Sequence, residues 1–290
     1  MAKPNKNIWT DKFFITEYLK LGSVDKVFRK HHYNLPISTP TYHRLINNWG
    51  IVGLVKTAGP NSNLSEVLLI LSRLLDTQLP IETFFRKHVP ASLKPTLSTT
   101  HRVVKKIKEG VIRRLGTALI ITPHHDFSKI LVGQDISLTN THFGHKGDLS
   151  LPMGYSKHQE DSTVSIRRIL EREVFTNKVI NQEFPHQLIP ENISSFMTIN
   201  IADVSVKVYH LKLPTSLLKH HQLSSFKLTN LRLTNSNKLA KHQPITKGIR
   251  PGVVEIAQCY QKHLANNLNL DLNNSIDCQL NKRLAYIFSN

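Results

Sequence analysis

An internal repeat in the first 112 residues limits the folds open to this chain more than any other feature. The tetrapeptide Phe28-Arg29-Lys30-His31 recurs 57 residues later as Phe85-Arg86-Lys87-His88. A second match follows each copy, with Tyr42-His43-Arg44-Leu45-Ile46 corresponding to Thr100-His101-Arg102-Val103-Val104. Two matches in the same order indicate one supersecondary unit that is present twice. The sequence therefore predicts two equivalent units, at residues 8–55 and 62–112.

Each unit is expected to consist of three short helices. In the first unit, Thr10 or Asp11 begins a helix that Gly22 ends, and Ser23 caps a second helix. The third helix begins at residues 38–40, where Ser or Thr is the cap and proline suits the first turn, and it continues to Trp49. The same pattern predicts helices at residues 64–75, 80–87 and 98–108 in the second unit.

Three short helices with a Ser- or Thr-led third helix describe a helix-turn-helix unit, and residues 22–51 resemble those of transposase-type and homeodomain-like DNA binders. The resemblance implies that the third helix places polar and basic side chains in the major groove. Arg44 and Arg102 would each contact a guanine or a phosphate, and lysines further along would follow the backbone. The candidate DNA-binding residues are Thr41, His43, Arg44, Thr100, His101, Arg102, Lys105 and Lys106. The alternative is a trihelical module that binds protein and exposes its basic residues to solvent.

The charge of the chain also favours a polyanionic partner. The formal net charge is +18, and residues 1–114 hold 19 Lys and Arg against 7 Asp and Glu. Such an excess attracts nucleic acid first and anionic membrane surfaces second. The alternative is a genome with a bias towards Lys and Asn codons, which the many asparagines would fit.

Several classes of protein are not expected. Two cysteines, Cys259 and Cys278, do not support a disulfide scaffold or a zinc site of recognised spacing. Neither an N-terminal signal peptide nor a run of ~18 apolar residues is present, so we expect a cytoplasmic protein with no membrane partner. The pairs His124-His125 and His220-His221 are interpreted as solvated loop residues and not as metal ligands.

The second half of the chain has an α/β pattern. Apolar β-rich runs at 116–122 and 129–134 flank a turn at 124–128 that predicts a hairpin, and Leu151-Pro152-Met153-Gly154 precedes an amphipathic helix at 161–175. Alternating residues predict a second hairpin that turns at Ala202-Asp203. A helix is expected from about Arg250 to Leu264, and the Asn-rich residues 266–290 are expected to form a loosely attached tail.

This order of elements resembles the Nudix superfamily, whose signature is G-x5-E-x7-R-E-U-x-E-E-x-G-U with U bulky and apolar. Gly154, Glu160 and Arg168 match it without a gap, and Leu170 and Glu173 match further along. The resemblance implies a Nudix-like α/β/α sandwich at residues 115–265. It also implies catalytic roles for Glu160, Arg168 and Glu173, a nucleotide-binding role for Gly154, and metal binding by Glu173.

The box departs from the signature at three positions. Ile169 and Arg172 stand where the family has glutamates, and Phe175 replaces the late glycine. Nudix enzymes cleave a diphosphate linked to another moiety and use divalent ions, and Mg²⁺ prefers several hard oxygen ligands. Positions 169, 172 and 173 share one helix face, which here carries only one carboxylate. We therefore expect impaired catalysis, with Mg²⁺ or Mn²⁺ as cofactor only if activity is retained and otherwise none.

The resulting hypothesis is an α+β multidomain protein, with N-terminal all-α tandem trihelical helix-turn-helix units followed by a Nudix-like α/β/α sandwich. Under this hypothesis the protein is a DNA-binding transcription regulator whose partner is duplex DNA. Its Nudix-like domain senses a nucleotide-diphosphate metabolite. The sequence leaves open whether the chain forms a homodimer. One alternative is an active Nudix-type pyrophosphohydrolase that recruits ligands from outside the box, such as Glu183 and Glu191. The other is an RNA- or protein-binding adaptor.

Overall fold

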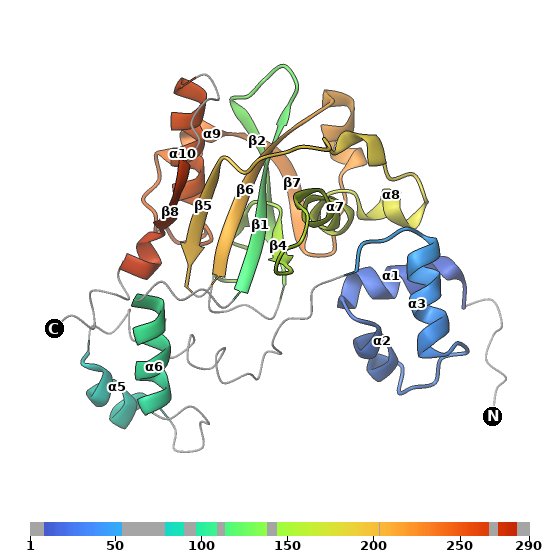
Figure 1. The fold of residues 1–290 in the computed structure, drawn as a ribbon, viewed down its shortest axis with the longest axis horizontal. Coiled ribbons are helices and arrows are strands. Elements are labelled where there is room, and N and C mark those ends of the chain that lie inside the picture. The colour runs from blue at the N-terminus through green and yellow to red at the C-terminus, as the bar shows by residue number, and fades with distance from the viewer. Residues whose placement is uncertain are drawn as a thin grey trace.

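The computed structural model describes residues 9–53, 79–89, 97–108, 114–137, 144–202, 204–266 and 272–282. Helices from the first part of the chain lie beside and below two sheets that the second part forms (Figure 1). The architecture is therefore mixed helix and sheet. No helix in the described ranges has the length and apolar character needed to cross a membrane.

Three helices form near the N-terminus where the sequence predicts them: α1 (Asp11–Leu21), α2 (Val24–Lys30) and α3 (Thr39–Asn48). The side chain of Thr10 caps α1 by accepting from the Phe13 N–H at 3.2 Å, and Gly22 ends it in the left-handed conformation. Ser38 caps α3 by accepting from the Thr41 N–H at 3.3 Å, with proline in the first turn. We refer to residues 9–53 as the first helical unit.

The second unit is described only in part. Its helices are α5 (Ile81–His88) and α6 (Leu97–Lys108), close to the predicted bounds, whereas the helix expected at 64–75 lies outside the described residues. In Figure 1, α5 and α6 lie apart from the first helical unit. Ile81 and Phe84 of α5 join the hydrophobic cluster around the larger sheet, while α1–α3 join a different cluster.

The larger sheet has the strand order β4-β1-β6-β5-β8. The interior strand β1 runs parallel to β6, with Ala118 opposite Val208, and antiparallel to β4, with Gly116 opposite Tyr155. The strands of this sheet are β1 (Arg114–Pro123), β4 (Met153–Ser156), β5 (Met197–Ile201), β6 (Val204–Leu213) and β8 (Leu272–Asp277). The smaller sheet has the order β3-β2-β7, with β2 (Lys129–Asp135), β3 (Leu149–Ser150) and β7 (Leu228–Asn235).

The hairpin expected between residues 116–122 and 129–134 is wrong, although both strands and the turn between them exist. β1 and β2 belong to different sheets: β1 pairs with β4 and β6, and β2 pairs with β3 and β7. The physical reason is burial. β1 is buried at every position from Thr117 to Pro123, so it lies inside the sheet, where β4 and β6 from later in the chain pair with it on both sides. The second predicted hairpin is present as β5 and β6, which pair antiparallel.

Helices cover both faces of the larger sheet. Along β1, Ala118 and Ile120 belong to the cluster that includes α10 (Val253–Ala265), whereas Leu119 and Ile121 belong to the cluster that includes α7 (Ser162–Glu173). The predicted helices at 161–175 and 250–264 are thus confirmed as α7 and α10. Short helices complete this part: α8 (Thr176–Ile180), α9 (Ser236–Ala240), η1 (His186–Leu188), η2 (Thr215–Leu218) and η3 (His220–Gln222).

Two further local features attach α10 and β8 to the rest of the larger sheet. Gly252 begins α10 at a φ of 87°, and a Cβ there would lie 2.3 Å from Cδ1 of Ile201, so both conformation and space require glycine. Of the segment expected to be a loose tail, the described residues 272–282 are attached to the fold, because β8 pairs parallel with β5 and Cys278 after it is fully buried. Asn281 explains the attachment, since its side chain exchanges two hydrogen bonds with the backbone of Ala202.

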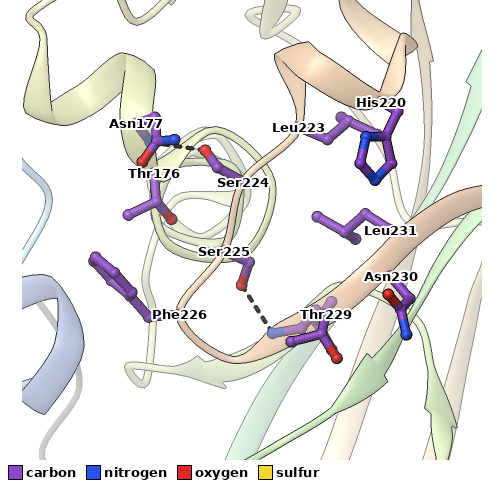
Figure 2. A pocket seen from close by; sticks show the side chains of 11 residues that line it. Thr176, Asn177, His220, Leu223, Ser224, Ser225, Phe226, Thr229, Asn230 and Leu231 are labelled. Carbon is purple, nitrogen blue, oxygen red and sulfur yellow. Dashed lines mark hydrogen bonds between the residues drawn. The ribbon is translucent and has the colours of Figure 1, made fainter.

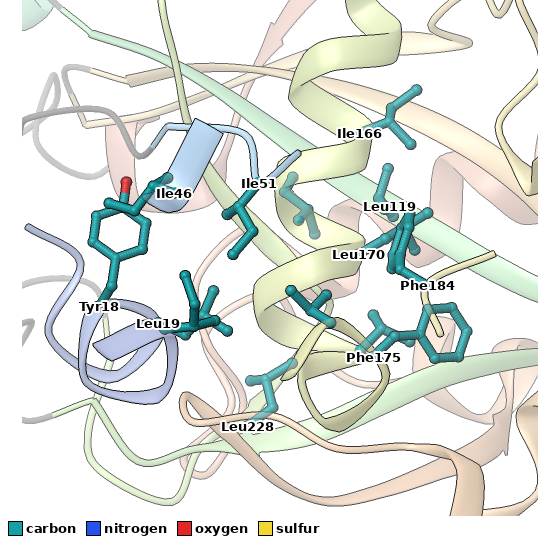
Figure 3. Close-up of a cluster of buried hydrophobic side chains, with 14 of the residues drawn as sticks. Tyr18, Leu19, Ile46, Ile51, Leu119, Ile166, Leu170, Phe175, Phe184 and Leu228 are labelled. Carbon is teal, nitrogen blue, oxygen red and sulfur yellow. The ribbon is translucent and has the colours of Figure 1, made fainter. Parts of the chain in front are cut away.

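The first helical unit packs against α7 and α8. Leu19, Ile46 and Ile51 of the unit belong to the same buried cluster as Leu170 and Phe175 (Figure 3). At the edge of the contact, Lys12 Nζ donates to Asn181 Oδ1 at 3.2 Å. Burial of apolar surface on both sides makes this a packed interface, with one face of α1 and the end of α3 used for docking.

Candidate functional site

Strand β4 and helix α7 bring the matched box residues together. Gly154 lies in β4 against α7, since a Cβ there would be 3.7 Å from both Glu173 Oε1 and Ile169 Cγ1. Asp161 is the N-cap of α7, with its side chain accepting from the Thr163 N–H at 2.8 Å, and Val174 is the C-cap. The loop between β4 and α7 carries Glu160.

Glu160 and Arg168 form a buried bidentate ion pair. Arg168 Nη1 donates to Glu160 Oε2 at 2.7 Å, Nη2 donates to Oε1, and both side chains are over 90% buried. Burial raises the pKa of Glu160, but the hydrogen bond from Arg168 and the Lys157 N–H outweigh it and lower that pKa. Arg168 Nε also donates to the carbonyl of Gly53 at 2.8 Å. The pair therefore braces the loop, the helix and the end of the first helical unit.

Both carboxylate oxygens of Glu173 are engaged. Oε2 accepts from the Met153 N–H at 2.9 Å, and Oε1 accepts from Lys227 Nζ at 2.8 Å. The same ammonium donates to the Met153 carbonyl at 2.6 Å. Sequence reasoning missed Lys227, because it lies 54 residues after Glu173 in the loop before β7, and no motif spacing connects the two.

The residues on this face of α7 do not fit a divalent metal. Ile169 is 2% exposed and apolar, Arg172 is cationic, and the two oxygens of Glu173 are already bound to internal donors. Glu183 and Glu191 are exposed, and the described ranges contain no cluster of three or more His, Cys, Asp or Glu side chains that could hold a metal ion. Mg²⁺ needs several oxygen ligands in near-octahedral geometry, so no step through a metal follows from this arrangement.

The candidate DNA-binding residues lie on two separate helices. On α3, His43 and Arg44 are exposed and Thr41 is half-buried, while the intervening Tyr42 is buried and donates to the Phe14 carbonyl. Asn47 continues the exposed face one turn on. This alternation gives α3 one face in the core of the unit and one polar face in solvent.

Helix α6 repeats a detail of α3. Arg44 Nη2 donates to Thr41 Oγ1 at 3.3 Å, and Arg102 Nη2 donates to Thr99 Oγ1 at 3.3 Å. His101, Arg102 and Lys105 are exposed, whereas Thr100 is fully buried in the place that corresponds to Tyr42. Burial removes Thr100 from the residues that a ligand could touch. Lys106 lies in α6, but its side chain is outside the described part of the structure.

The repeated tetrapeptide has a structural role in its first copy. Lys30 Nζ lies 2.6 Å and His31 Nε2 lies 3.0 Å from Oε2 of Glu17, which is 5% exposed. Burial raises the pKa of Glu17, but these hydrogen bonds and the charges of the nearby lysines lower it by more, so the net effect is a lowered pKa. The carboxylate is therefore charged. Two basic residues of the repeated tetrapeptide are thus paired with an internal acid.

A pocket of about 290 Å³ lies beside the start of α8. Figure 2 shows it between the end of the box helix and β7, with Ser224 accepting from the Asn177 N–H at 2.8 Å. Its lining is mainly polar and does not include the matched box residues. The lining residues are Thr176, Asn177, His220, Leu223, Ser224, Ser225, Phe226, Leu228, Thr229, Asn230 and Leu231.

Comparison with known proteins gives structural similarity alone. No protein-family model matches the chain. No curated protein matches it in sequence either. A MutT protein from Methanosarcina mazei Go1 is similar in structure, with 11% identity, a TM-score of 0.36, and coverage of 53% of this chain and 94% of that protein.

Two further structures are similar to the same extent. A Nudix hydrolase from Nitrosomonas europaea has 11% identity, a TM-score of 0.34, and coverage of 57% of this chain and 78% of its own. An Ap4A hydrolase from C. elegans has 13% identity, a TM-score of 0.34, and coverage of 54% and 98%. Identities this low and TM-scores below 0.5 carry no conclusion about the activity of this chain.

Proposed function

We propose that this chain is a DNA-binding regulator whose second half is a Nudix-like domain that binds a nucleotide-diphosphate metabolite without hydrolysing it. One observation carries the DNA-binding part: α3 keeps a polar face with His43, Arg44 and Asn47 exposed, while other surfaces of the same unit are docked on α7 and α8. A recognition helix must be free on the side that enters the groove. The docking described above leaves that side of α3 open.

The charge distribution supports the same proposal. Residues 1–114 carry two thirds of the excess positive charge of the chain. Neutralising DNA phosphates releases condensed counterions, which supplies affinity that depends steeply on salt. Exposed Arg29, Arg44 and Arg102 offer such contacts on α2, α3 and α6.

The non-hydrolytic part of the proposal rests on the box. Its helix face presents Ile169, Arg172 and a Glu173 that is bound by Lys227 and Met153. A hydrolase of this kind needs carboxylates free to hold metal ions that position water and neutralise the diphosphate. The order β1, β4, α7, then the β5–β6 hairpin supports a Nudix-like fold for this part.

A fluorescence titration of the full chain with labelled duplex DNA tests DNA binding over a range of salt concentrations. We expect a log–log slope of affinity against salt of roughly −5 for six phosphate contacts. Arg44→Ala and Arg102→Ala should each reduce discrimination between duplexes by about 1–3 kcal/mol, whereas Lys105→Ala should weaken binding to all sequences and flatten the slope by about one unit.

The matched control is Lys207→Ala, because Lys207 is an exposed lysine on β6 and belongs to neither α3 nor α6. This variant should bind DNA like the wild type. If the full chain shows no salt-dependent binding to DNA at low ionic strength, the regulator proposal fails. Binding to RNA alone under the same conditions would then favour an RNA adaptor.

A further inference from the structure

We infer that the ammonium of Lys227 is a built-in cation that takes the place of a divalent metal at the box. The inference rests on the proposed Nudix-like alignment of Gly154, Glu160, Arg168 and Glu173, and it does not depend on DNA binding. It predicts that the carboxylate of Glu173 is a structural anion, bound permanently by the protein's own side chain.

The geometry around Lys227 is that of a closed ring. Nζ donates to Glu173 Oε1 at 2.8 Å and to the Met153 carbonyl at 2.6 Å, while Glu173 Oε2 accepts from the Met153 N–H at 2.9 Å. The Lys227 side chain is 15% exposed and that of Glu173 is 3% exposed. One carboxylate and one backbone carbonyl, the oxygen types that a metal would use, both point at the ammonium.

Hydrogen bonds to the backbone N–H and to the carbonyl of Lys227 fix its position. Ser225 Oγ accepts from the Lys227 N–H at 3.0 Å and from the Leu228 N–H at 2.9 Å. The Lys227 carbonyl accepts from the Ile136 N–H at 2.9 Å, which ties the loop to the end of β2. The side chain therefore leaves a fixed point next to β7 and reaches the box without rearrangement of the loop.

A metal ion and this ammonium would compete for the same oxygens. Mg²⁺ sits about 2.0–2.1 Å from its ligands, so it can contact Glu173 Oε1 and the Met153 carbonyl only if Nζ leaves. Leaving would place the lysine charge among buried groups without its partner, and separation of a buried ion pair is strongly unfavourable. The cationic Arg172 next to Glu173 in the sequence adds to the opposing charge.

The test compares the full chain with Lys227→Met, which keeps the length of the side chain and removes its charge. We expect Mn²⁺ to leave the melting temperature of the wild type unchanged. We expect Lys227→Met to melt at a lower temperature, and to bind Mn²⁺, measured by loss of the free-ion electron paramagnetic resonance signal, at least about tenfold more tightly than the wild type. Lys207→Met is the control and should behave as the wild type in both measurements.

A second variant covers the case in which Lys227→Met does not fold. Lys227→Met/Glu173→Gln removes both charges, and it should fold and melt higher than Lys227→Met because no buried carboxylate is left without a partner. Three results would overturn the inference. They are Mn²⁺ binding by the wild type that Glu173→Gln abolishes, a folded Lys227→Met that gains no Mn²⁺ binding, and a double variant no more stable than the single one.

Discussion

The carboxylate of Glu171 on α7 accepts a hydrogen bond of 3.0 Å from the backbone N–H of Val52, at the end of the first helical unit. Its other oxygen accepts from Arg167 Nε at 2.7 Å, and the guanidinium of Arg167 donates to the Gly50 carbonyl. Together with the hydrogen bond from Arg168 to the Gly53 carbonyl, three hydrogen bonds join residues 50–53 of the unit to α7. The helix that carries the box residues is therefore also the docking surface for the first helical unit.

Removal of the Glu171 carboxylate should weaken this junction. Glu171→Ala leaves the Val52 N–H and Arg167 Nε without their acceptor, and a polar group orphaned in this way costs about 1–3 kcal/mol. We expect a loss of about 2 kcal/mol in the free energy of unfolding, measured by urea denaturation of the full chain. Glu183→Ala, at an exposed glutamate, is the control. A change for Glu171→Ala no larger than that of the control would contradict the structural role of the bond.

The chain should show hydrolysis at or near background with nucleoside diphosphate derivatives. The reason is the face of α7, where Ile169 and Arg172 supply no ligand and Glu173 is bound by Lys227. The measurement is a phosphate-release or chromatographic assay with Mg²⁺ and with Mn²⁺, on wild type and Glu173→Gln side by side. Robust turnover that Glu173→Gln abolishes would favour the hydrolase over the regulator.

Loss of the Glu17 carboxylate should destabilise the first helical unit. Glu17→Gln keeps the shape of the side chain but removes the charge that faces Lys30 and His31, and a hydrogen bond to a charged group contributes about 1.5–3 kcal/mol. Because the pKa of Glu17 is lowered in the folded protein, its contribution is present above pH 4.5 and is lost as pH falls through the folded value. We expect Glu17→Gln to be less stable than the wild type at pH 7, by urea denaturation, and the difference to shrink on acidification. Asp25→Asn, at an exposed position on α2, should show neither effect.

Much of the helical structure could be predicted from the sequence because its signals are local. Thr10, Ser38 and Asp161 each cap a helix through a hydrogen bond to a backbone N–H two or three residues later, and each is recognisable from the pattern alone. The box register is local in the same sense. Gly154 and Glu173 meet because one short loop connects a strand to a helix.

The features that could not be predicted depend on contacts between distant segments. β1 pairs with β6, about 90 residues away, and nothing in an apolar run says which strand will lie beside it. The hydrogen bond between Lys227 and Glu173 joins residues 54 positions apart in the sequence, and the one between Val52 and Glu171 joins residues 119 positions apart. An isolated lysine in a basic chain carries no sequence signal that distinguishes an internal counterion from a solvated one.

We expect His210 to make the stability of the protein sensitive to acid. Its ring Nε2 lies 3.0 Å from Thr122 Oγ1 and 3.3 Å from the Tyr260 hydroxyl, and the rings of Phe127 and Tyr260 lie against it. Burial, followed by the charges of Lys212 and His263, lowers its pKa from 6.5 to about 4. The imidazole is thus neutral in the folded protein at pH 7.

A histidine whose pKa is lowered by folding binds its proton more tightly in the unfolded chain. Its contribution to stability is therefore complete above pH 6.5 and is lost as pH falls from 6.5 towards 4. A difference of this size corresponds to at most on the order of 3 kcal/mol. Urea denaturation at a series of pH values should show His210→Gln with a smaller loss of stability between pH 6.5 and 4 than the wild type. His125→Gln, at an exposed histidine, should keep the wild-type slope, and an unchanged slope in His210→Gln would place the acid sensitivity elsewhere.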